Sequence, residues 1–182
     1  TDEMRLVIGA QACLLLVESG YCSFGKLRSI LVYPDAYQAK SDLGVESIRL
    51  GESWQTGSVV LSWESVVQGA KNPEDGLNVV IHEFAHQIDQ FDGVADGLPI
   101  LERRSDYQEW AQEFRASFRL LCDRVEAGKR TVLDQYGATN PAEFFAVATE
   151  TFFEKPDSLQ EAHAALYDLL KRFYGLDPLA WH

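Results

Sequence analysis

Two histidines and a glutamate in the stretch LNVVIHEFAHQIDQFDG (residues 77–93) have the residue types and spacing of a metal-dependent hydrolytic site. His82 and His86 are four residues apart, which on a helix separates them by about 40° around the axis and about 6 Å along it. Each imidazole can then offer one nitrogen to a common ion. Glu83 is turned about 100° from His82, so it misses the ion but can reach a water beside it. The HExxH spacing therefore predicts two metal ligands and a general base.

The helix that carries these residues has a separate apolar face, which we expect to pack on the core. Its members recur at helical spacing: Leu77, Val80, Ile81, Phe84, Ala85 and Ile88. Asp89 lies on the histidine face and could accept the second N–H of an imidazole, or be a solvated surface residue. The alternative to a metal site is an ordinary helix with two histidines on its polar face.

A catalytic zinc site normally has three protein ligands, so a third residue must come from elsewhere in the chain. The HExxHxxGxxH pattern is excluded, because Asp89 and Asp92 occupy its glycine and third-histidine positions. His163 is predicted on the surface of the last helix, and His182 is the final residue. A glutamate on a later helix is the better candidate.

The segment NPAEFFAVATETFF (residues 140–153) offers that glutamate. Glu143 is one candidate ligand, but Asn140 followed three residues later by Glu143 is also the pattern of a helix capping box. Glu150 lies two turns further on the same face and is a competing ligand. Tyr136, in the preceding loop, could donate a hydrogen bond to an oxyanion, or be a packed loop tyrosine. The local pattern leaves each of these alternatives open.

The elements around these residues indicate an α+β fold, with strands in the first half and helices after them. Strands are predicted at 29–34, 47–51 and 58–63, with a polar loop at 35–46. Helices are predicted at 4–18, from 72–76 to about 91, at 105–127, at 140–153 and at 157–174. The HExxH helix is expected to pack on a small mixed sheet, and an extended peptide is expected to pair along 58–63.

Composition excludes several classes of function. The 182-residue chain has a net charge of −12 and lacks a basic stripe, so we expect no nucleic-acid partner. The apolar stretch 6–17 is too short to span a bilayer, and acidic residues stand where a signal peptide would be basic. Three cysteines without a CxxC spacing indicate reduced thiols in the cytoplasm, not a cysteine-rich zinc site.

Several segments together resemble the Mlc titration factor A family of zinc peptidases: VVIHEFAHQIDQFDG, YGATNPAEFFAVATETFF, LGESWQTGSVVLSW, LRSILVYP and LVIGAQACLLL. The likeness runs over nearly the whole chain. It implies a gluzincin-type site, similar in plan to the catalytic domain of anthrax lethal factor. It implies that His82, His86 and Glu143 hold one zinc ion, that Glu83 is the general base, and that Tyr136 stabilises the transition state.

The resemblance also carries expectations for the whole protein. Residues 1–182 are expected to form one zincin-like catalytic domain, lacking a longer helical segment that family members carry before the position of Thr1. The implied function is a cytoplasmic, aminopeptidase-like activity on peptides, together with binding of the glucose-responsive repressor Mlc, and no membrane partner is expected. The alternative is a non-catalytic regulatory protein that sequesters a transcription factor and keeps a structural or vestigial zinc site.

Overall fold

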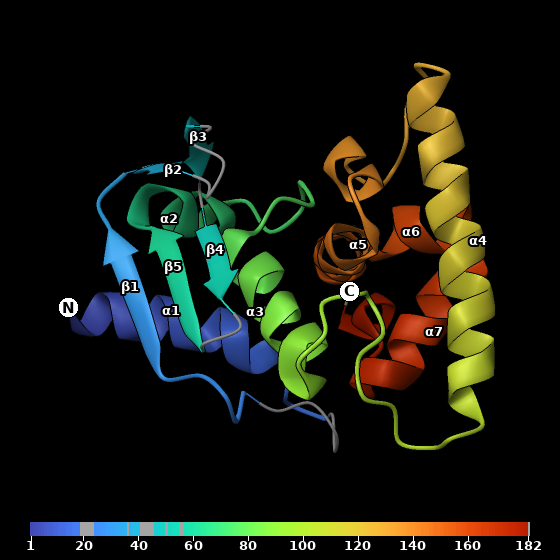
Figure 1. The fold of residues 1–182 in the computed structure, drawn as a ribbon, viewed down its shortest axis with the longest axis horizontal. Coiled ribbons are helices and arrows are strands. Elements are labelled where there is room, and N and C mark those ends of the chain that lie inside the picture. Colours follow the sequence, from blue (N-terminus) through green and yellow to red (C-terminus); the bar gives the residue numbers. More distant parts are fainter. Residues whose placement is uncertain (19–23, 36, 41–45, 50, 55–56, 182) are drawn as a thin grey trace.

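The computed structural model describes residues 1–18, 24–35, 37–40, 46–49, 51–54 and 57–181 (Figure 1). Its first half combines helices with short strands: α1 (Asp2–Leu14), β1 (Ser29–Tyr33), β2 (Tyr37–Lys40), β3 (Glu46–Arg49), β4 (Gly51–Trp54), β5 (Ser58–Ser62), α2 (Trp63–Lys71) and α3 (Val79–Asp89). Its second half is helical: α4 (Asp106–Glu126), α5 (Pro141–Glu154), α6 (Pro156–Ala162) and α7 (Ala164–Tyr174). Short 3-10 helices cover Gln90–Asp92, Gln135–Ala138 and Pro178–Trp181. The predicted α+β class is confirmed.

The main sheet has the strand order β1-β5-β4 and is mixed, as predicted. Strand β5 pairs in parallel with β1 and antiparallel with β4, and Val59, Val60 and Leu61 are buried, as expected for a central strand. The prediction that a peptide pairs along 58–63 is therefore wrong, because both sides of β5 are already paired. Among the described residues, the unpaired edge next to α3 belongs to β4.

Two predicted boundaries in the first half are also wrong. Strand β2 lies inside the predicted loop 35–46 and pairs antiparallel with β3. The helix predicted to begin near residues 72–76 begins at Val79 instead, and α2 precedes it. The chain turns at Gly76, whose φ of 76° is in the left-handed region. Asn78 then caps α3, and Leu77 is left 55% exposed outside the helix.

Helices α3 and α5 lie side by side between the sheet-containing part and the α4–α7 part (Figure 1). Helix α5 is buried on almost every side, because aromatic residues from α4 and α7 pack around it. The ring centroids of Phe114 and Phe144 are 4.8 Å apart, and those of Trp110 and Phe173 are 5.2 Å apart. This packing fixes α5 against α4 and α7.

The C-terminal helix predicted at 157–174 is divided at His163 into α6 and α7. No helix in the described ranges is both long enough and apolar enough to cross a membrane. Cys13 and Cys122 are free thiols, and Cys22 lies outside the described residues.

Candidate metal centre

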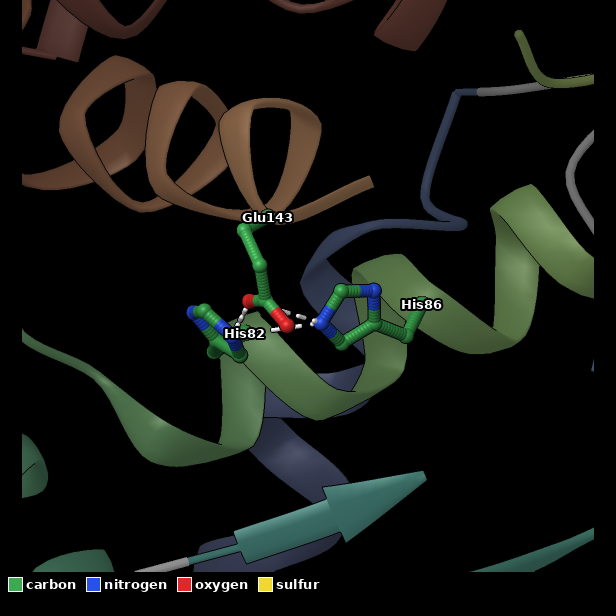
Figure 2. A group of neighbouring side chains, drawn as sticks. All are labelled: His82, His86 and Glu143. Carbon is green, nitrogen blue, oxygen red and sulfur yellow. Dashed lines mark hydrogen bonds and ion pairs between the residues drawn. The ribbon is translucent and has the colours of Figure 1, made fainter. Parts of the chain in front are cut away.

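The structure brings His82 and His86 of α3 against Glu143 of α5 (Figure 2). The Nε2 atoms of the two histidines are 3.2 Å apart. Glu143 Oε2 lies 3.0 Å from Nε2 of His82 and 3.3 Å from Nε2 of His86. The first turn of α5 thus delivers a carboxylate to the imidazole pair that one turn of α3 presents.

These spacings fit a metal ion. Ligands arranged tetrahedrally about 2.0–2.1 Å from a zinc ion lie about 3.3 Å from one another. The three observed separations between the donor atoms fall in the range 3.0–3.3 Å. Two imidazole nitrogens and a carboxylate oxygen this close together are three electron-pair donors converging on one point, which is the chemistry of a ligand set.

The other ring nitrogen of His82 is held by Glu150. His82 Nδ1 donates to Glu150 Oε1 at 2.7 Å. Glu150 also accepts the backbone N–H of Asn78 at 2.5 Å. With Nδ1 held by Glu150, Nε2 is the ring nitrogen that faces Glu143 and His86. Glu150 therefore orients a histidine and does not itself join the three-residue group.

The site redistributes protons between its members. Burial alone would raise the pKa of Glu143, but hydrogen bonds from His82 and His86 hold that pKa well below its ordinary value. Burial alone would lower the pKa of His82, but its hydrogen bonds to Glu143 and Glu150 raise that pKa well above the ordinary value. The carboxylate at 143 is thus ionised at neutral pH and ready to bind a cation.

Glu83 is buried beside this group, with only 6% of its surface exposed. Burial raises the pKa of Glu83 to about 8, against the opposing effect of His82. The neighbouring carboxylates of Glu143, Glu150 and Glu52 contribute in the same direction as burial. An acid of this kind can both accept and release a proton near neutral pH.

Asp89 fits neither alternative that the sequence offered, which were an acceptor for an imidazole N–H and a solvated surface residue. It is 1% exposed, so it is not a solvated surface residue. Its Oδ2 accepts the N–H of Gly97 at 3.0 Å, which ties the loop after α3 back onto the helix. Asp89 Oδ1 and His86 Nδ1 are both buried without a hydrogen-bond partner among the described residues, so the predicted contact between the two is not formed.

Comparison with known proteins identifies the family. The family described as glucose-regulated metallo-peptidase M90 matches residues 1–175. This chain belongs to that family.

Relatives of this M90 metallopeptidase align over almost the whole chain. A Synechocystis protein designated uncharacterized protein slr2042 is 46% identical over 188 residues, which cover 98% of this chain and 68% of that protein. Mlc titration factor A of Serratia proteamaculans is 32% identical and covers 99% of this chain and 72% of the relative. The protein of the same name from Pectobacterium atrosepticum is 31% identical, with coverages of 99% and 71%.

A metallopeptidase family implies a bound metal ion, and His82, His86 and Glu143 form a group that could hold one. The two sequence alternatives for Glu143 turn out to be compatible in the M90 chain. Asn140 Oδ1 accepts the backbone N–H of Glu143 at 2.9 Å and caps α5, as the pattern predicted. The Glu143 side chain points at the two imidazoles (Figure 2). The backbone of Glu143 therefore takes part in the helix cap, and its carboxylate takes part in the candidate metal site.

The remaining sequence candidates lie at different distances from the group. Tyr136, in the 3-10 helix Gln135–Ala138, is 53% exposed, and its ring centroid is 6.0 Å from that of His82. His163 lies between α6 and α7 and is not part of the group. His182 lies outside the described residues.

Three residues that support the M90 site were not predicted from the sequence. Asn78 caps α3 and binds Glu150, and Gln87 donates to Ser53 on β4 at 2.6 Å. The signal for Asn78 was present, since asparagine is a favoured N-cap before an apolar helix. The Gln87–Ser53 contact carried no local signal, because it joins two segments that are distant in sequence.

Proposed function

We propose that residues 1–182 act as a zincin-like, zinc-dependent peptidase of the gluzincin type. One zinc ion would be held by His82, His86 and Glu143. The observation that carries this proposal is the mutual spacing of the three donor atoms, which matches a tetrahedral ligand set. Zinc bound there supplies positive charge that polarises a scissile carbonyl and lowers the pKa of a water molecule.

Glu83 is the proposed general base. It follows His82 on the same rigid helix and is buried beside the group, where a carboxylate can take a proton from water and pass it to a leaving amine. Tyr136 is the proposed donor to the oxyanion that forms on the substrate carbonyl. Its position beside His82, with 53% of the residue exposed, supports this role.

The proposed substrate is an extended peptide that pairs with the unpaired edge of β4. This edge replaces the predicted one, and it is the strand edge nearest the HExxH helix. Main-chain pairing would lay the peptide across α3 and bring one of its carbonyls to the metal centre. The aminopeptidase-like activity expected from the sequence resemblance places the proposed cleavage close to the amino terminus of the peptide.

A second proposed function is the binding of a repressor protein. It is motivated by the name Mlc titration factor A, which several relatives carry. A purely regulatory protein with a structural zinc site would need neither Glu83 nor Tyr136, so their presence beside the metal group favours catalysis as well. Both functions are proposed for the cytoplasm, where a transcriptional repressor acts.

The first prediction concerns Glu83→Gln. This variant keeps the size of the side chain but removes the proton acceptor, so hydrolysis should fall by about 10²–10⁴-fold. Zinc content should stay at one ion per chain, because Glu83 is not among the proposed ligands. The measurements are hydrolysis of alanine p-nitroanilide and of an internally quenched peptide, with and without a zinc chelator, together with elemental analysis.

Glu161 is an exposed glutamate on α6, and Glu161→Gln makes the same chemical change there. This variant is the matched control and should behave as the wild type. Full activity in Glu83→Gln, or activity that survives removal of the metal, would show that the peptidase proposal is wrong. Binding of a repressor by an inactive Glu83→Gln protein would separate the regulatory function from the catalytic one.

A further inference from the structure

Strand β4 lies against the HExxH helix through two matched pairs of residues. Glu83 and Gln87 are one turn apart on α3, and Gly51 and Ser53 are two apart on β4, so each pair shares one face of its element. Gly51 contacts Glu83, and Ser53 Oγ accepts the side-chain N–H of Gln87 at 2.6 Å. Helix and strand therefore meet at two points along their length (Figure 1).

The contact at Gly51 leaves no room for a side chain. A Cβ atom there would lie 2.5 Å from Glu83 Oε1, 2.7 Å from Glu83 Cγ and 2.7 Å from Val79 Cγ2. Gly51 is not among the glycines with positive φ, so its backbone could be adopted by other residues. Glycine inside a strand weakens the strand, and a close approach of another group is the usual reason for it. Here that group is the carboxylate of Glu83.

Packing, not hydrogen bonding, holds the Glu83 carboxylate. No hydrogen bond joins it to any other residue in the described part of the chain. A buried carboxylate without donors has no polar contact to select its rotamer, so the surfaces around it must do so. The bare backbone of Gly51 forms one of these surfaces, and the Ser53–Gln87 hydrogen bond fixes how closely β4 approaches α3.

We propose that β4 positions the general base: Gly51 provides the space that sets the Glu83 rotamer, and Ser53 holds the strand at the required distance through Gln87. This inference rests on the proposed peptidase function. Gly51 and Ser53 are positioning residues, since both act through α3. The strand whose edge would bind the peptide thus also positions the general base. The peptide and Glu83 would therefore be held in place by the same element.

The test is Gly51→Ala. Displacement of a catalytic group by about 1 Å can cost about 10²-fold in rate, so kcat should fall by about 10–100-fold. KM and zinc affinity should each stay within about 3-fold of wild type, because the displaced group binds neither peptide nor metal in this proposal. A crystal structure of the metal-free variant should show the Glu83 carboxylate moved while both imidazoles keep their places.

Gly9→Ala is the matched control, because nothing lies within 4 Å of a Cβ at that helical glycine. It should leave kcat and the metal affinity unchanged. Ser53→Ala is the second variant, and it creates no clash in case Gly51→Ala folds poorly. Loss of the hydrogen bond to Gln87 should lower the kcat of Ser53→Ala by about 3–10-fold and leave its zinc affinity unchanged. This loss is smaller than the one expected for Gly51→Ala, because Glu83 is displaced less.

A double-mutant cycle separates positioning from a general effect on the fold. Glu83→Ala removes the Oε1 and Cγ atoms that a Cβ at position 51 would approach, and with them the base itself. Gly51→Ala should therefore lower the residual kcat of Glu83→Ala by a much smaller factor than it lowers the kcat of the wild type. Equal costs in both backgrounds would overturn the inference, as would wild-type kcat in Ser53→Ala and in folded Gly51→Ala. Activity retained in Glu83→Gln would instead show that the proposed function itself is wrong.

Discussion

At the scale of single residues, the candidate metal group depends on a carboxylate that lies outside the group. Glu150 holds Nδ1 of His82 through one oxygen and the backbone N–H of Asn78 through the other. Both carboxylate oxygens are thus occupied by donors, and each contact restricts the other. The result is an imidazole whose ring orientation is fixed, with Nε2 facing Glu143 and His86.

Glu150→Gln tests this arrangement. Glutamine has one acceptor oxygen where two N–H groups each need one, so His82 or Asn78 loses its partner. We expect zinc affinity to fall by about 10–100-fold, the usual effect of losing a partner of a histidine ligand. Competition against a chromophoric chelator measures this affinity, with Glu161→Gln as the control. Unchanged affinity in Glu150→Gln would mean that the hydrogen bond does not prepare the site.

Residue spacing predicted the positions of His82, Glu83 and His86 because all three lie on one helix, where geometry follows from sequence. Residue spacing allowed two roles for Glu143, because a capping box and a metal site can use the same glutamate. It was wrong for Asp89, because the partner of that carboxylate is a backbone N–H of Gly97, presented by a loop that folds back on α3. Contacts made by loops of this kind leave no periodic pattern.

At the scale of elements, the end of α5 is tied to the beginning of α3. Glu154 accepts the N–H of Gly76 at 3.0 Å and the side-chain N–H of Asn78 at 2.9 Å. Asn78 in turn caps α3 by accepting the N–H groups of Val80 and Ile81. This network aligns the two helices that carry the metal group, at the opposite end of α5 from Glu143.

The network makes stability depend on pH. Burial raises the pKa of Glu154 to about 7, from an ordinary value of 4.5. Because the folded pKa is the higher one, folding favours the protonated acid; that contribution is complete below about pH 4.5 and is lost as the pH rises through about 7. Relative to Glu154→Gln, the wild type should lose about 1–3 kcal/mol of unfolding free energy between about pH 5 and pH 8.

Denaturant unfolding of both proteins at a series of pH values, with chelator present, measures this difference. The other ionisable groups are common to both proteins, so their contribution cancels in the comparison. Parallel pH profiles for the wild type and Glu154→Gln would contradict the assignment.

The helices were easier to predict than the strands. Periodicity and caps identified α1, α3, α4 and α5, because helical contacts are local. Helix α2 follows β5 without a loop, and the predicted strand 58–63 extends one residue into this helix, to Trp63. Strands β2 and β4 have four residues each, and strand order depends on pairing between distant segments. The central position of β5 therefore had to come from the structure.

At the scale of the whole molecule, the metal group exists only because two halves of the chain meet. The histidines belong to the half that contains the sheet, and Glu143 belongs to the helical half. Contacts between α3 and α5, including the hydrogen bonds from the backbone of Gly76 and Asn78 to Glu154 and Glu150, bring these halves together, and nothing local in either segment specifies them. The α+β class could be predicted from the order of strands and helices, whereas the contact between α3 and α5 could not.

Crystals grown with zinc and measured at the zinc absorption edge give the most direct test. We expect one anomalous peak per chain, about 2.0–2.2 Å from Nε2 of His82, from Nε2 of His86 and from a carboxylate oxygen of Glu143. A peak at another place, or a zinc ion held by the histidines while Glu143 turns away from it, would contradict the proposed metal centre.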